Sequence, residues 1–411
     1  MGYRRSANLS ERSKGFTRRQ FLSGGVAVAG VSTLGVGAIW RPRSFAQPAA
    51  TPGALDDDLR VSTSGWKTDF SRHSVSLSEF QAGGPPRDGI PPVDAPRYVS
   101  LTEASTWLEA REPVIAVALA GSARAYPLQI MIWHEIVNDE LAGRPLLVTF
   151  CPLCNTAIAF DRRLAPDGPV YDFGTTGNLR LSDLVMWDRQ TESWWQQLTG
   201  EAIVGELTGA RLTPLPAQII GWDAFKRAYP EADVLSRETG VDRPYGENPY
   251  PGYDDIDSSP FLFTGESDGR LAPMERVVGV EHAGATVAYS FAALAETGVI
   301  NDRLDGWDVA VFYAPGARSA LDAATIAGSR DVGQAGVFSR VVDGRTLTFR
   351  PAGNGRFTDE ETGTIWDITG QSQEGPLAGR QLEPLPHTVV FWFAWAAAYP
   401  KTRLWSPPGG E

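Results

Sequence analysis

An internal repeat constrains this chain more than any other feature of its sequence. Glu112-Pro113-Val114-Ile115 aligns with Glu275-Arg276-Val277-Val278 at an offset of 163 positions. The agreement continues in the same order, with small changes of offset, through matched aromatic, Pro, Gly and Asp residues. These are Ala125-Tyr126 with Ala288-Tyr289, Asn138-Asp139 with Asn301-Asp302, Phe173 with Phe349, Asp188, Thr191 and Trp195 with Asp359, Thr362 and Trp366, and Ala228-Tyr229-Pro230 with Ala398-Tyr399-Pro400. We therefore expect a tandem duplication, with repeat 1 at residues 112–236 and repeat 2 at residues 275–411.

Short apolar runs separated by turn residues indicate that each copy is built mostly from strands. In repeat 1, the turn Ala120-Gly121-Ser122 separates two alternating segments, which is the signature of a hairpin. A second hairpin is expected through Asp167-Gly168. The predicted strands are Val114–Leu119, Arg124–Leu128, Leu146–Phe150, Ala157–Asp161 and Val170–Phe173.

A short helix is expected near the end of each copy. Trp222, Phe225 and Tyr229 fall on one helical face, and Pro230 ends the helix. The predicted fold class is therefore mainly β or α+β: two tandem, pseudo-equivalent, β-rich lobes with few short helices. An extended N-terminal arm, residues 47–111, precedes them, and residues 237–274 form a linker rich in Tyr, Pro, Gly and Asp.

The first 46 residues have the pattern of a twin-arginine signal peptide. Thr17-Arg18-Arg19-Gln20-Phe21-Leu22 precedes an apolar run over residues 24–40, and Ser44-Phe45-Ala46 supplies small residues for cleavage. We expect export by the twin-arginine translocase to the periplasm or the extracellular space. The alternative is an uncleaved N-terminal anchor, although the run is short for a span. No later stretch is long and apolar enough to cross a membrane.

The charge of the chain argues against nucleic acid and anionic membranes as partners. The leader contains eight Arg and Lys against one acid, so its removal takes the formal net charge from −12 to −19. A protein this acidic repels phosphate backbones and anionic lipid surfaces. Beyond the translocase, the sequence names no partner.

Comparison of the two copies indicates where the chemistry lies. Trp133-His134-Glu135 in repeat 1 corresponds to Glu296-Thr297-Gly298 in repeat 2, and Cys151-Pro152-Leu153-Cys154 corresponds to Ala314-Pro315-Gly316-Ala317. The same backbone is expected to fold without these side chains, so repeat 1 keeps them for function. They include the only two cysteines of the chain.

Two cysteines three positions apart, directly after a predicted strand, suit a thiophilic metal ion such as zinc, copper or iron. His134 precedes the strand that ends at Cys151, so the chain can return the imidazole to the same loop. A fourth ligand is needed for a tetrahedral site, and the candidates are Glu135, solvent or His73 from the arm. The predicted metal ligands are therefore Cys151, Cys154 and His134, with Glu135 or His73 completing the set.

Other interpretations of the cysteine pair remain open. Cys-Pro-Leu-Cys has the form of a thiol–disulfide redox motif, but the segment after it is predicted as a strand, and no helix N-terminus would lower the thiol pKa. The pair can also be structural. A third hypothesis is a non-catalytic binding module whose 13 Trp line a groove, although many of these Trp recur at matching positions, which favours a role in the core. Whether the protein is an enzyme stays undecided.

Several motifs taken together resemble the bacterial and archaeal family catalogued as domain of unknown function 3179. They are His73-Ser74-Val75, Gly83-Gly84-Pro85-Pro86-Arg87-Asp88-Gly89-Ile90-Pro91, Trp133-His134-Glu135-Ile136-Val137-Asn138-Asp139 and Phe150-Cys151-Pro152-Leu153-Cys154. The resemblance extends from about Asp69 to Trp405, and it departs at Thr191-Glu192-Ser193-Trp194-Trp195, where Thr-Gly-Ser-Leu-Trp is expected. It implies no established activity.

Overall fold

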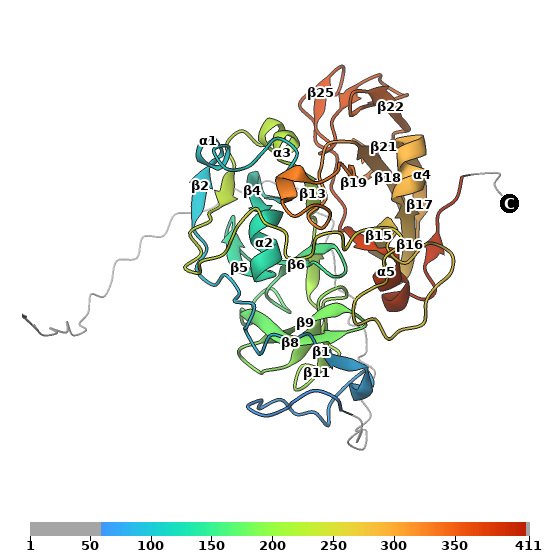
Figure 1. Cartoon of the computed structure of the whole chain (residues 1–411). Helices are drawn as coiled ribbons and strands as arrows, with labels where there is room; N and C mark the ends of the chain where they lie inside the picture. Colours follow the sequence, from blue (N-terminus) through green and yellow to red (C-terminus); the bar gives the residue numbers. More distant parts are fainter. Residues whose placement is uncertain (1–58, 408–411) are drawn as a thin grey trace, which may run out of the picture. The chain divides into compact units, whose positions relative to one another are not determined.

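The structure is a computed structural model that describes residues 59–407, and these residues form a mainly β fold with few short helices (Figure 1). This agrees with the fold class predicted from the sequence. All described residues belong to one compact unit. None of their helices is long and apolar enough to cross a membrane. The predicted signal peptide at residues 1–46 lies outside the described residues, so export remains a proposal.

The first half of the described chain contains three sheets and three short α-helices. The strands are β1 (Phe80–Ala82), β2 (Tyr98–Ser100), β3 (Pro113–Leu119), β4 (Ser122–Pro127), β5 (Ile136–Leu141), β6 (Arg144–Cys151), β7 (Thr156–Asp161), β8 (Phe173–Arg180), β9 (Asp183–Asp188), β10 (Trp194–Gln196), β11 (Glu201–Val204), β12 (Thr213–Leu215), β13 (Gln218–Gly221) and β14 (Asp233–Leu235). The helices are α1 (Leu101–Ala104), α2 (Leu128–His134) and α3 (Trp222–Ala228), with the 3-10 turn η1 (Leu77–Glu79). The sheet orders are β13-β3-β4-β14-β2, β12-β7-β6-β5 and β1-β8-β9-β10-β11.

The second half repeats much of this order. Its strands are β15 (Arg276–His282), β16 (Ala285–Ser290), β17 (Val299–Leu304), β18 (Trp307–Ala314), β19 (Gln334–Ser339), β20 (Val341–Val342), β21 (Arg345–Thr346), β22 (Phe349–Gly353), β23 (Arg356–Asp359), β24 (Ile365–Trp366), β25 (Ser372–Glu374), β26 (Thr388–Phe391) and β27 (Arg403–Leu404). The helices are α4 (Phe291–Thr297) and α5 (Trp392–Ala398), with the 3-10 turn η2 (Ile326–Gly328). The sheet orders are β26-β15-β16-β27, β17-β18-β19, β20-β21 and β22-β23-β24-β25.

Matched residues of the two halves make the same contacts. Trp195 and Trp366 are fully buried, and each indole Nε1 donates to the Asp seven positions earlier, Asp188 or Asp359, at 2.9 Å. The other shared pairs are Tyr126–Asp139 with Tyr289–Asp302, and Asn138–Phe173 with Asn301–Phe349. The duplication remains our proposal, and these contacts support it. They also place recurring Trp in the core rather than along a binding groove.

One predicted hairpin does not form. β7 pairs with β6 and β12, whereas Val170–Phe173 joins the preceding segment through an isolated bridge between Arg163 and Val170 and through contacts of Arg162 with Tyr171 and Asp172. β6 and β7 are buried on both faces, so an unpaired edge of β7 would leave buried backbone N–H and C=O groups without hydrogen bonds. β12 supplies the second neighbour, and its Thr213 pairs with Asp161, 52 positions earlier, which a local pattern cannot reveal.

The described part of the N-terminal arm packs against the third sheet. β1 pairs with β8, and residues 83–89 continue along that strand. A Cβ at Gly177, where φ is +77°, would meet the carbonyl oxygen of Pro85 at 2.1 Å, so the close approach of the arm requires glycine there. Asp88 accepts hydrogen bonds from the Thr175 amide and the Trp187 indole. The arm thus completes the sheet that carries half of the candidate site.

Candidate metal centre

Cys151 and Cys154 lie at the ends of a tight loop between β6 and β7. Cys151, the last residue of β6, pairs with Thr156, the first residue of β7, so the chain reverses within four residues. Asn155 has a φ of 55°, a left-handed conformation that Asn tolerates better than most residues. Both thiols are free, and the residues are 1% and 0% exposed. The loop therefore brings two sulfur atoms into the protein interior.

Asp183 joins the two cysteines, although the sequence interpretation did not include it. It begins β9 directly after Leu181 and Ser182, which both have positive φ, as in the two-residue turns that connect hairpin strands. The sulfur atoms of Cys151 and Cys154 and a carboxylate oxygen of Asp183 all lie within 4.8 Å of one another. The cluster thus unites side chains from two different sheets.

The two oxygens of the Asp183 carboxylate have different surroundings. Oδ2 accepts hydrogen bonds from the Gln196 side-chain amide and from the Leu198 backbone N–H, the latter at 3.0 Å. Oδ1 is buried and has no hydrogen-bond partner among the described residues. A buried carboxylate oxygen without a partner carries a large desolvation cost. The unpartnered Oδ1 therefore favours a ligand-binding role for this cluster over a purely structural one.

Burial opposes ionisation throughout the cluster. It raises the pKa of Asp183 to about 6, against the hydrogen bonds from Gln196 and Leu198 and the nearby Cys154 thiol, which lower it. It also raises the pKa of the Cys154 thiol, and the neighbouring Cys151 and Asp183 add to this effect. The thiols contact the carbonyl of Ser182, with Cys154 Sγ donating at 3.4 Å. A cation at the centre would reverse this preference for the neutral forms.

Glu135 is the predicted ligand whose surroundings come closest to the cluster. It follows α2 with a φ of 59°, where the matching residue after α4 is Gly298 with a φ of 71°. Its backbone carbonyl accepts from Phe150, the neighbour of Cys151. Burial, then the charge of Asp183, raises the pKa of the Glu135 carboxyl to about 8. No side-chain hydrogen bond to Glu135 is present among residues 59–407, and the carboxylate lies outside the group of three.

The structure does not bring His134 to the cysteines. Its Nδ1–H donates to the carbonyl of Pro91 at 2.7 Å, and Nε2 accepts from the hydroxyl of Tyr245 at 2.6 Å. Both ring nitrogens therefore have protein partners, and burial lowers the imidazole pKa, which keeps the ring neutral. His134 ties the arm and the linker to the end of α2. It does not contribute an atom to the cluster of three.

His73 likewise lies apart from the cysteines. Its backbone forms an isolated bridge with Val204 of β11, and Nδ1 donates to the carbonyl of Val75 at 2.8 Å. Nε2 is buried without a hydrogen-bond partner in the described part of the chain. Histidine ligation by His134 or His73 therefore remains a prediction that this geometry does not favour.

A signal for Asp183 does exist in the sequence. Asn178 and Asp188 are ten positions apart, whereas their counterparts Asn354 and Asp359 are five apart. Repeat 2 is therefore shorter in the hairpin that carries Asp183. Comparing residue types between the two proposed copies points to the cysteines. Comparing the lengths of the matching hairpins would have pointed to the segment that contains Asp183.

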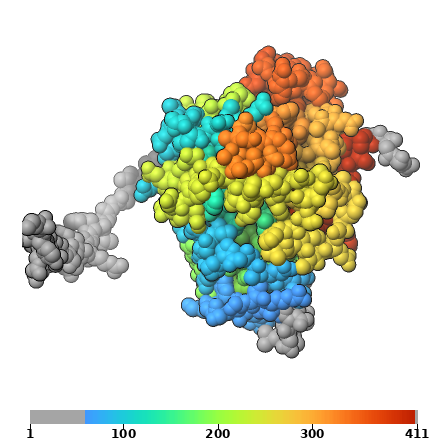
Figure 2. Space-filling model, in the orientation of Figure 1, coloured from blue at the N-terminus to red at the C-terminus, as the bar shows by residue number. Residues whose placement is uncertain are grey.

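Part of the linker covers the site. We call residues 245–263 the strap; in Figure 2 the yellow-green and yellow segment that contains it runs across this face of the molecule. The hydroxyl of Tyr253 donates to the carbonyl of Leu153 at 3.0 Å, inside the cysteine loop. Ser182 Oγ donates to the carbonyl of Phe261. The strap thus contacts both loops that form the cluster.

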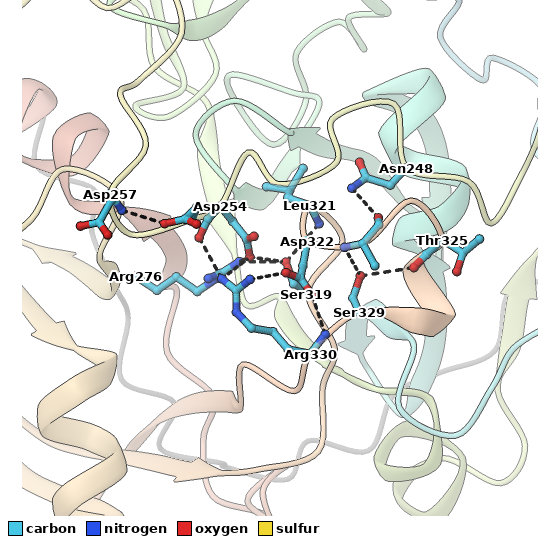
Figure 3. Close-up of polar contacts among 12 residues, drawn as sticks. Asn248, Asp254, Asp257, Arg276, Ser319, Leu321, Asp322, Thr325, Ser329 and Arg330 are labelled. Atoms are coloured by element: carbon cyan, nitrogen blue, oxygen red, sulfur yellow. Dashed lines mark hydrogen bonds and ion pairs between the residues drawn. The ribbon is translucent and has the colours of Figure 1, made fainter.

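A buried ion pair fixes the strap to the second half of the chain (Figure 3). Asp254, whose side chain is fully buried, follows Tyr253 directly. Its Oδ2 accepts from Arg276 at 2.5 Å and from Ser319 at 2.5 Å, and it forms an ion pair with Arg330 at 3.0 Å; Arg330 Nη2 also donates to the Asp254 backbone carbonyl. The guanidinium of Arg276, then Ser319 and Arg330, lower the pKa of Asp254 against the effect of burial. Repeat 2 therefore holds the cover of the site in repeat 1.

One cavity borders the cluster at Asp183. Asp183, Gln196 and Arg180 line a cavity of about 220 Å³ together with residues of β11 and α5. Two larger cavities, of about 360 and 320 Å³, adjoin His387 and contain none of the three clustered residues. Their walls are mainly apolar. The smaller cavity is the one of these three that is lined by a residue of the cluster, Asp183.

A family model described as protein of unknown function (DUF3179) matches residues 87–402. The match includes Cys151, Cys154, Asp183 and Glu135 and excludes His73. The curated proteins and the solved structures contain no match to the chain.

Proposed function

The chain belongs to the DUF3179 family of proteins of unknown function, and from its geometry we propose that it binds one thiophilic metal ion. Cys151, Cys154 and Asp183 are the proposed ligands, and Glu135 or solvent takes the fourth position. The observation that carries the proposal is the unpartnered, buried Oδ1 of Asp183 beside two buried thiols. A metal ion would supply the partner that this oxygen lacks.

The donor set favours zinc. Zinc accepts Cys sulfur and Asp or Glu oxygen in tetrahedral sites, whereas Cu(I) prefers sulfur ligands alone. Ferrous iron accepts the same mixed set and is the second candidate ion. Two thiolates and one carboxylate carry a formal charge of −3, so a divalent ion compensates most of it. The cavity beside Asp183 provides the path by which an ion enters.

The thiol–disulfide alternative has less support. Exchange requires a thiolate that a partner sulfur can reach, but both cysteines are buried and burial raises the pKa of Cys154. β7 begins two residues after Cys154, so no helix N-terminus stabilises a thiolate. The pair therefore suits a bound cation better than an exchange reaction.

We propose that the protein is exported in the folded state. The support is the Arg18-Arg19 pattern and the apolar run that follows it. Folding in the cytoplasm would fill the site before an oxidising compartment closes the thiols into a disulfide. The proposed place of work is the periplasm or the extracellular space.

Metal analysis of the full chain tests the binding proposal. The protein is purified from the exported fraction without chelators, and its metal content is measured together with free thiols. We expect about one zinc or iron per chain, and loss of the metal in Cys151→Ser and in Asp183→Asn. Metal-free wild-type protein that takes up neither ion would overturn the proposal, and a disulfide in that protein would favour the redox alternative.

A further inference from the structure

We infer that Gln196 is a positioning residue that orients Asp183 towards the metal ion, and that Arg180 in turn orients Gln196. This inference rests on the proposed function and names residues that the proposed ligand set does not contain. Gln196 is the last residue of β10 and is 4% exposed. Its side chain contacts Asp183, which lies on the neighbouring strand β9.

Gln196 provides one of the two hydrogen bonds that hold Oδ2 of Asp183 and leave Oδ1 without a partner. Gln196 Nε2 and the Leu198 backbone N–H both donate to Oδ2. With its lone pairs occupied from that side, Oδ2 is held at the sheet, and Oδ1 remains free for a metal ion. Ligands of protein metal sites are commonly fixed by such outer hydrogen bonds.

Arg180 determines the orientation of the Gln196 amide. Its Nη1 donates to Gln196 Oε1 at 3.2 Å, and its Nη2 forms an ion pair with Glu79 at 2.5 Å. A guanidinium can only donate, so Oε1 must face Arg180 and Nε2 must face Asp183. The reverse orientation would set the amide oxygen against a carboxylate. The contacts Glu79–Arg180–Gln196–Asp183 therefore permit only one orientation of the Gln196 amide.

The neighbouring residue Gln197 provides a matched control. It is on the same chain segment and fully buried, but its Nε2 donates to Thr149 Oγ1 at 2.8 Å and its Oε1 accepts from Thr156. Replacing either glutamine by Met removes three side-chain hydrogen bonds and keeps a similar volume. Only Gln196 contacts Asp183.

The experiment compares Gln196→Met, Gln197→Met and wild type as full-length proteins. Zinc affinity is measured by competition with a chelator, and the absorption spectrum of the Co²⁺-substituted protein reports ligand geometry. We expect Gln196→Met to weaken zinc binding by about 10- to 100-fold and to change the Co²⁺ spectrum, while Gln197→Met keeps both near wild type.

Two results would overturn the inference: unchanged affinity and spectrum in Gln196→Met, or equal losses in both variants. A wild-type protein that binds no metal would refute the proposed function itself, so the two failures are distinguishable. If the Gln196→Met protein does not fold, the Arg180→Met variant is used instead. This variant keeps the Gln196 side chain but removes the contact with Arg180 that fixes the orientation of its amide. Weaker zinc binding in Arg180→Met is then expected, and wild-type binding would contradict the inference.

Discussion

Glu135 and Gly298 occupy the same left-handed position, directly after α2 and α4 respectively. Glycine adopts this conformation without strain, whereas a residue with a Cβ does not. Three further non-glycine residues with positive φ, Asn155, Leu181 and Ser182, flank the same cluster. Residues in strained backbone conformations cluster at functional sites. Replacing Glu135 should therefore affect the stability of the protein and its metal binding in opposite directions.

Glu135→Gly should stabilise the metal-free protein by about 1 kcal/mol, because it relieves the left-handed strain and removes a buried acid. It should also weaken zinc binding if Glu135 is the fourth ligand. Chemical denaturation of the apo protein and a chelator competition measure the two effects. A less stable apo protein would show that the Glu135 side chain is there for packing.

Cys151→Ala combined with Cys154→Ala should leave a folded, cooperative protein. The matching residues Ala314 and Ala317 are buried in repeat 2 at 3% and 1% exposure, so this backbone accepts alanine at both positions. We expect a loss of at most about 2 kcal/mol in the free energy of unfolding of the apo protein. An unfolded double variant, beside a folded apo wild type, would assign the pair a structural role.

His134→Phe should lower stability but keep the metal. The substitution leaves the Pro91 carbonyl and the Tyr245 hydroxyl without their partner, at a cost of about 1–3 kcal/mol. Metal content and thermal unfolding are measured on the same preparation, with Cys151→Ser as the metal-free reference. Loss of the metal from folded His134→Phe protein would restore His134 as a ligand.

Asp254→Leu should release the strap. It leaves Arg276 buried without its counter-ion, which costs about 3–5 kcal/mol, and Asp254→Leu with Arg276→Met should recover part of this loss. Reaction of the apo protein with a thiol reagent is expected to accelerate in the single variant, because Tyr253 and Phe261 no longer cover the cysteine loop. Wild-type thiol reactivity in a folded Asp254→Leu protein would mean that the strap does not control access.

The half-buried His387 should make the protein less stable in mild acid. Burial lowers its pKa from 6.5 to about 4, against the hydrogen bond to Leu385, which raises it. Between these two values the unfolded chain binds a proton that the folded chain does not, so stability falls as the pH drops from about 6.5 to about 4. We expect a loss on the order of 1–3 kcal/mol over this window. His387→Phe should flatten the dependence in denaturation at pH 7 and pH 5, and an unchanged slope would contradict the assignment.

The sequence alone determined the strand-rich fold class, the positions of several strands and of one helix, and the cysteine loop. Alternating and continuous apolar runs depend on local periodicity, so β3, β4, β6 and α3 were predicted within one or two residues. The comparison of the two proposed copies within the chain drew attention to Cys151 and Cys154.

Only the tertiary structure decided what surrounds the cysteines. Asp183 reaches them through the packing of two sheets, and no periodicity records which sheet faces which. His134 is next to Glu135 in sequence, yet it turns to Pro91 and Tyr245, because the chain leaves α2 in a left-handed conformation and neighbouring side chains diverge there. The predicted second hairpin failed for the same reason, since strand β12, distant in sequence, occupies the edge of β7. Contacts between residues far apart in the chain depend on the burial of whole sheets, and the site is made of such contacts.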